Sequence, residues 1–401
     1  RDRLMPYFIA VNNTRTRDLD LVATGHQRVL RARLSDAQFF YRSDIKASFA
    51  PWKEKLEGVL FQAKLGSMQE KVSRVKALAA HLADAEGLDT GFKSRVTRAA
   101  ELCKADLVSQ VVVEFPKLQG VMGRVYAGVV GEPQDVASAI EEHYQPTYSG
   151  GKLPATKTGA LLAIADKIDS ICGCFSVGLI PTGASDPYAL RRQGIGIVNI
   201  MQDKGFSFSL RGLIVESLER FKSKGDFDLE VTTEKVHTFI QNRLAHILVE
   251  KGFSKDVVAA VISAGTANMP HVWLRVKALE DLKGAPDFEP LAAAFKRVVN
   301  IIKKTQGGDE AGVNEALFTH SSEHNLWAAF KAAENQVSEL FTTGDFEKAL
   351  LKIAALKDVV DAFFDDVLVM DEDLQVRNNR LALLGNIAAL FDKIADFSKL
   401  A

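Results

Sequence analysis

The sequence predicts a mainly α-helical protein with more than one domain. Its 401 residues are 47% hydrophobic, so the chain is long enough to bury more than one core. Apolar residues recur at helical spacing from about residue 42 onward, whereas a strand-like run occurs only near the start. Breaks rich in glycine and proline separate the helical segments. We therefore expect a multidomain helical protein with a short α/β remnant at its N-terminus.

The first part of the chain, residues 1–41, combines an apolar run with an arginine-rich helix. The run Leu4–Val11 has the composition of a strand, and the chain begins without methionine. We therefore expect residues 1–41 to be the end of a preceding domain, and the chain to be a piece of a longer polypeptide.

Residues 42–190 show almost continuous helical patterning and are predicted to form one all-helical domain. Within it we expect helices at 72–82, 94–113, 133–144 and 161–168, with a Pro/Gly/Ser-rich connection at 145–158.

Two later breaks divide the remaining chain. The first, Lys224–Asp226, separates two helices, and the second, at 283–287, contains glycine and proline and is the better domain boundary. We therefore predict a helical middle domain over 191–289 and a helical bundle over 290–401. One face of a bundle helix is expected to carry Leu381, Leu384, Ala388 and Phe391.

Composition restricts the class of protein. The apolar stretch at 160–181 is interrupted by charges, so no membrane span is expected. The three cysteines, Cys103, Cys172 and Cys174, indicate a reducing compartment and buried thiols, because a disulfide scaffold or zinc site needs more partners. We expect a cytoplasmic protein without membrane or DNA partners.

The run Gly178–Arg192 combines a loop and a helix start. Pro181 and Gly183 break the preceding apolar segment, and Asp186 stands before a proline as in many helix starts. Arg191 and Arg192 then open the next helix with two adjacent cations. This arrangement suits a polyanion, although an ordinary capped helix with a solvated arginine pair is the alternative.

The same run reads GLIPTGASDPYALRR and resembles the signature GLIPTGSKDPFALRR of the β subunit of bacterial heterotetrameric glycyl-tRNA synthetases. Residues 25–40, GHQRVLRARLSDAQFF, are similar to a second family segment. Further similar segments follow in the family's order at 58–67, 114–124, 141–146, 363–370 and 377–384. The resemblance covers nearly the whole chain.

The resemblance implies that residues 42–190 are a degenerate HD-like domain. Working HD phosphohydrolases bind a metal through a lone His, a His-Asp pair and a later Asp. These positions correspond to Lys71, to Lys104 and Ala105, and to Asp166, so three of the four ligands are missing. We expect no metal, and we keep an active HD-type nucleotide phosphohydrolase as the alternative function.

The resemblance also implies a function. Residues 290–401 resemble a DALR-type anticodon-binding bundle, and in the family the β subunit recognises tRNA(Gly) while the α subunit performs aminoacylation with ATP. We expect an α2β2 enzyme, with no catalytic residue and no cofactor in this chain. A purely structural helical scaffold is a third interpretation.

Seven arginines are the predicted tRNA contacts, because guanidinium groups bind phosphates well. They are Arg28, Arg31, Arg33, Arg191, Arg192, Arg377 and Arg380. Pairing with nearby carboxylates, such as Asp36, Asp44, Asp186 and Asp371, is the alternative for each cluster. Residues 290–401 hold 12 Lys and Arg against 17 Asp and Glu, a net charge of −5, so the bundle must bind RNA through local cations.

Overall fold

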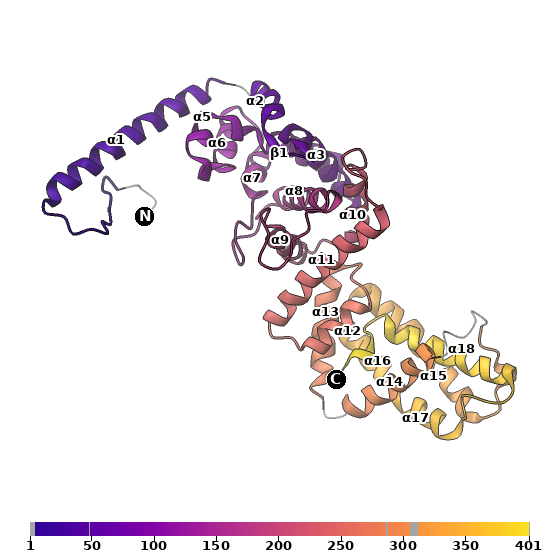
Figure 1. Cartoon of the computed structure of the whole chain (residues 1–401). Coiled ribbons are helices and arrows are strands. Elements are labelled where there is room, and N and C mark those ends of the chain that lie inside the picture. The colour runs from indigo at the N-terminus through magenta and orange to yellow at the C-terminus, as the bar shows by residue number, and fades with distance from the viewer. Residues whose placement is uncertain (1–4, 48, 286–287, 305–311, 401) are drawn as a thin grey trace. The chain divides into compact units, whose positions relative to one another are not determined.

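The structure is a computed structural model that describes residues 5–47, 49–285, 288–304 and 312–400. Contacts divide the chain into two compact units. Unit 1 comprises Arg1–Thr147 and Gly151–Asp166, and unit 2 comprises Tyr148–Gly150 and Lys167–Ala401. Both units are helical, and the expected mainly α fold is confirmed (Figure 1). The four-domain division stays a prediction.

Unit 1 is built from helices and contains one short hairpin. The core forms where α3 packs on α4 and α7 packs on both α4 and α6. Its elements are α1 (Leu19–Asp44), α2 (Phe49–Lys55), β1 (Leu60–Gln62), β2 (Gly66–Ser67), α3 (Met68–Ala85), α4 (Thr90–Leu102), α5 (Gln110–Glu114), α6 (Val121–Val129), α7 (Gln134–Glu142) and the first half of α8 (Lys157–Ser176). The predicted helices at 72–82, 133–144 and 161–168 are confirmed.

Helix α1 is held to unit 1 at its C-terminal end. Asp44 is its only residue described as buried. The Asp44 carboxylate accepts hydrogen bonds from the backbone N–H of Gln110 and Val111, each at 3.0 Å, and from the Tyr126 hydroxyl at 2.8 Å. Because a buried carboxylate needs such donors, this contact fixes where α1 leaves the core.

Two expectations for unit 1 are wrong. The described residues 5–11 form no strand, and Leu4 lies outside the described residues. The expected helix over 94–113 is interrupted after Leu102, and α5 starts anew because the Ser109 side chain accepts a hydrogen bond from the N–H of Val112 at 3.2 Å. A side chain that caps the backbone in this way favours a helix start over a continuous helix.

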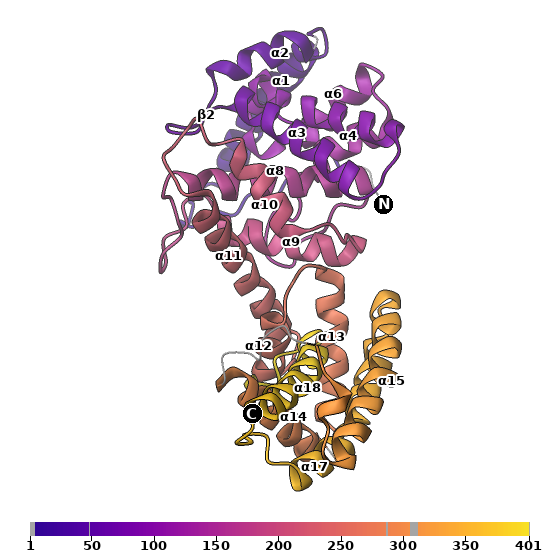
Figure 2. The ribbon, with the colours of Figure 1, turned by 90° about the vertical axis from the view of Figure 1, so that its right-hand side faces the viewer.

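Unit 2 contains two groups of packed helices. Helices α9 and α10 pack on α11, and the C-terminal bundle is formed where α14 packs on α17 and α18, and α15 on α16 and α17 (Figure 2). The helices are α9 (Leu190–Lys204), α10 (Leu210–Glu219), α11 (Leu229–Glu250), α12 (Lys255–Ser263), α13 (Met269–Lys283), α14 (Phe288–Lys304), α15 (Ser321–Thr343), α16 (Phe346–Ala354), α17 (Lys357–Asp366) and α18 (Leu374–Asp392).

Several sequence-based details of unit 2 are confirmed. Lys224–Asp226 lies between α10 and α11, and the predicted face of α18 is buried, with Phe391 stacked on Phe295 at 4.0 Å between ring centroids. Of the predicted boundary at 283–287, Pro286 and Asp287 lie outside the described residues. The three cysteines are buried, and none of them is in a disulfide. None of the described helices combines the length and the apolar character that crossing a membrane requires.

Candidate nucleic-acid interface

The loop between α8 and α9 is shaped by its own backbone and by Asp186. Thr182 and Ser185 exchange two backbone hydrogen bonds, and Gly183 between them has φ +49°. The Asp186 carboxylate accepts hydrogen bonds from the N–H of Leu190 at 2.8 Å and of Arg191 at 3.0 Å. This carboxylate therefore caps α9, as the helix-start prediction requires.

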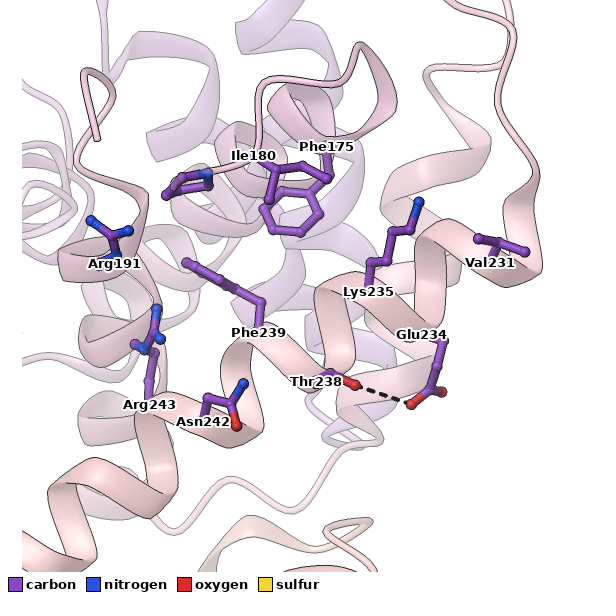
Figure 3. Close-up of a pocket in the computed structure, with 11 residues that line it drawn as sticks. Phe175, Ile180, Arg191, Val231, Glu234, Lys235, Thr238, Phe239, Asn242 and Arg243 are labelled. Carbon is purple, nitrogen blue, oxygen red and sulfur yellow. Dashed lines mark hydrogen bonds between the residues drawn. The ribbon is translucent and has the colours of Figure 1, made fainter. Parts of the chain in front are cut away.

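The two arginines that open α9 have different surroundings. Arg191 is half-buried and lines a cavity of about 720 Å³, whereas the exposed Arg192 does not line it (Figure 3). The cavity walls come from the end of α8, the loop, α9 and α11. The lining residues are Phe175, Ile180, Pro181, Arg191, Val231, Glu234, Lys235, Thr238, Phe239, Asn242 and Arg243.

Helix α11 contributes an arginine stacked on an aromatic ring. The guanidinium carbon of Arg243 lies 4.6 Å from the centroid of the Phe239 ring, one helical turn away. Both side chains press against α9 at Gly194, where an added Cβ would lie 3.2 Å from Arg243 Cγ and 3.3 Å from Phe239 Cε1. A glycine at 194 thus lets the two helices approach closely and brings Arg243 beside Arg191.

Of the four positions compared with HD metal ligands, Lys71, Lys104 and Asp166 form a charge cluster in unit 1. Lys71 Nζ lies 3.3 Å from Asp166 Oδ1 and donates to the Asp166 carbonyl at 3.0 Å, and Lys104 Nζ lies 3.3 Å from Asp166 Oδ2. The two lysine side chains are only 4% and 6% exposed. Their ammonium groups neutralise Asp166 and would repel a metal ion at this position.

The arginines of α1 lie on the surface of unit 1. Arg28, Arg31 and Arg33 are all exposed. Arg33 is ion-paired with Glu114, while Arg28 and Arg31 have no ion pair to any described residue. Asp44, an expected partner of this cluster, is instead engaged by the donors from α5 and α6 described above.

Comparison with known proteins places the chain in a family. Residues 1–263 match the family described as "Glycyl-tRNA synthetase beta subunit". The chain belongs to the glycyl-tRNA synthetase beta subunit family. Residues 291–397 match a second family, described as "DALR anticodon binding domain".

Relatives of the family match the chain from end to end. A glycine–tRNA ligase beta subunit of Desulfatibacillum aliphaticivorans is 53% identical over all of this chain and 58% of its own length. The beta subunit of Geobacter metallireducens is 48% identical over 100% of this chain and 57% of its own length. That of Syntrophus aciditrophicus is 44% identical over 99% of this chain and 57% of its own length. The chain thus spans less than two thirds of these curated relatives.

In the DALR-type bundle the two predicted arginines differ sharply. Arg380 is 2% exposed and donates hydrogen bonds to Glu323 Oε1 at 2.9 Å, to Asp371 Oδ2 at 2.7 Å and to the Thr319 hydroxyl at 2.8 Å. A phosphate contact needs an accessible guanidinium, and that of Arg380 is occupied inside the domain. Arg377 is half-buried and has no ion pair to any described residue.

Sequence reasoning missed Arg243 and Phe239 of the cavity. Their spacing of four residues was a signal, because it places them on one face of a helix. That they face Arg191 follows only from the packing of α11 on α9.

Asp106, next to the HD-like positions, should make stability depend on pH. It accepts hydrogen bonds from the N–H of Gly120 at 2.6 Å and Gly123 at 3.0 Å, and burial raises its pKa to about 6. Because the folded state binds this proton more tightly than the unfolded chain, the stabilisation is present below about pH 4 and is lost as the pH rises through about 6. Between these pH values the free energy of unfolding should fall by on the order of 2–3 kcal/mol because of Asp106, and this fall should be absent in the Asp106→Asn variant. Urea denaturation measures both. An unaltered pH slope in the variant would contradict the assignment.

Replacing Arg380 and replacing Arg377 should affect the stability of the DALR-type bundle differently. Arg380→Ala leaves the fully buried Glu323 carboxylate without its guanidinium, so the free energy of unfolding should fall by about 3–5 kcal/mol. Arg377→Ala, the matched control on the same helix, should change it by less than about 0.5 kcal/mol. Thermal and urea unfolding of both variants provide the measurement. Equal losses in the two variants would show that the pairing of Arg380 does not stabilise the bundle.

Proposed function

We propose that this chain is the part of a glycyl-tRNA synthetase β subunit that binds tRNA(Gly). The observation that carries the proposal is the match of residues 291–397 to a DALR anticodon-binding domain, in a chain whose first 263 residues match the β-subunit family. The relatives bear the name of a ligase subunit. Recognition of tRNA, and not bond-making chemistry, is then the task of these residues.

We also propose the setting in which the chain acts. Glycylation takes place on an α subunit that uses ATP, and the two kinds of subunit assemble as α2β2 in the cytoplasm. No catalytic residue and no cofactor is assigned to this chain, and neither a membrane nor DNA is a partner. Support comes from the designation of the relatives as beta subunits.

RNA binding by the C-terminal bundle has to rely on individual cations. Its net charge of −5 opposes diffuse attraction to phosphates. The Arg297 guanidinium lies 4.1 Å from the centroid of the Phe364 ring, so this cation is fixed on an aromatic face. Arg377 is not tied to a carboxylate, and it is the bundle residue that we assign to a phosphate.

Binding measurements on the whole chain test the proposed function. We expect tRNA(Gly) to bind more tightly than a competing tRNA of another specificity, as followed by fluorescence anisotropy. Arg377→Ala should weaken the binding and lower the magnitude of the log–log salt slope by about one, because one phosphate contact is lost. Lys348→Ala is the control, since Lys348 is an exposed cation of the same bundle that is paired with Asp345. A chain that binds no tRNA would overturn the proposal, and an unchanged slope in Arg377→Ala would overturn only the role of Arg377.

The alternative, an HD-type nucleotide phosphohydrolase, has its own test. With Lys71 and Lys104 paired to Asp166, we expect less than one equivalent of transition metal by elemental analysis and no nucleotide hydrolysis. Asp166→Ala should leave both measurements unchanged. A stoichiometric metal and a phosphohydrolase activity that both disappear in Asp166→Ala would establish the alternative.

A further inference from the structure

The cavity beside the Gly178–Arg192 loop has two chemically different ends (Figure 3). The guanidinium groups of Arg191 and Arg243 lie together at one end, and the rings of Phe239 and Phe175 lie in the middle. Glu234 and Lys235 stand at the other end. A flat apolar surface next to paired cations is the combination that a nucleotide requires, because its base is a planar ring and its phosphate is an anion.

We propose that this cavity binds one unpaired nucleotide of an RNA, with the base against Phe239 and the phosphate on Arg191 and Arg243. The inference rests on the proposed function, since it assigns a site for the bound tRNA. Arg191 belongs to α9, and Phe239 and Arg243 belong to α11. Of these three residues, Arg191 was among the predicted tRNA contacts.

The base side of the site is already formed. Phe239 is half-buried, and its ring is held edge-to-face by Phe175, with centroids 5.2 Å apart and planes at 62°. Ile180 of the loop remains 38% exposed and faces the same cavity. A cavity of about 720 Å³ lies within the ordinary size of small-ligand sites, and this volume is sufficient for one nucleoside.

On the phosphate side, neither Arg191 nor Arg243 forms an ion pair with a described residue. Arg243 Nη1 is buried and has no hydrogen-bond partner among the described residues. Burial and the neighbouring Arg191 lower the pKa of Arg243, against an opposing contribution from the Asp186 carboxylate, so the two guanidinium groups oppose each other's charge. The Asp186 carboxylate is directed at the N–H groups that start α9. A phosphate at the partly exposed faces of the two guanidinium groups would add a negative charge between them and relieve the repulsion.

Variants of the whole chain separate the two halves of the site. Phe239→Leu keeps an apolar side chain against Phe175 but removes the stacking surface, and it should weaken tRNA(Gly) binding about tenfold, the usual effect of losing one stacked base. Arg243→Gln should lower the magnitude of the salt slope by about one, whereas Arg243→Lys should keep it. Arg220→Gln is the matched control, since Arg220 is a half-buried arginine of the same unit that is paired with Glu216 and does not line the cavity.

Two further probes make the test specific for unpaired RNA. Phe239→Leu should weaken binding of a single-stranded oligoribonucleotide as well, but should not affect a blunt RNA duplex. Ultraviolet crosslinking of the unaltered chain to tRNA(Gly), read by mass spectrometry, should mark the α11 peptide that contains Phe239. This second measurement does not depend on the folding of any variant.

The outcomes distinguish this site from the proposed function. If the unaltered chain binds tRNA(Gly) and the Phe239 and Arg243 variants match it in affinity and salt slope, the site is refuted and the proposed function stands. If the unaltered chain binds no tRNA, both fail. Variants that lose binding to the α subunit but keep their tRNA affinity would show that the cavity receives a protein, which also overturns the inference.

Discussion

The requirement that a buried charge be matched organises both units of this chain. A charged side chain taken out of water is costly unless ionic or hydrogen-bonding partners replace the water. Asp166 is matched by Lys71 and Lys104, and Arg380 by Glu323 and Asp371. These groups link segments that are far apart in sequence, so each pairing holds helices in place as well as satisfying a charge.

The same requirement separates cations that maintain the fold from cations that are free to bind RNA. Arg380 and Arg377 are only three residues apart on α18, yet the first is inside and the second is not. Arg33 is engaged by Glu114, while Arg28 and Arg31 on the same helix extend from the surface. The number of arginines therefore overstates how many cations are available to a ligand, because burial and ion pairing engage some of them inside the fold.

Lys71, Lys104 and Asp166 form a charge cluster inside unit 1. The two lysine ammonium groups flank the Asp166 carboxylate, and Lys104 Nζ also lies 4.1 Å from the centroid of the Tyr144 ring. The positive charge beside the Asp166 carboxylate therefore comes from two side chains of the protein itself, Lys71 and Lys104. The ion pairs join α3 and the segment that follows α4 to α8.

The sequence by itself determined the helical class, most helix positions and the family resemblance, because apolar periodicity, capping residues and a long motif are local features of the chain. It could not show that residues 5–11 form no strand, because a strand needs a partner strand and the described chain pairs none with these residues. Nor could it show that a new helix starts at Ser109, where the side chain accepts a hydrogen bond from the N–H of Val112. The tertiary structure alone decided which arginines are buried and brought Phe239 and Arg243 to Arg191. Those contacts depend on the close approach of α9 and α11 at Gly194, and such a contact between distant segments has no counterpart in local sequence.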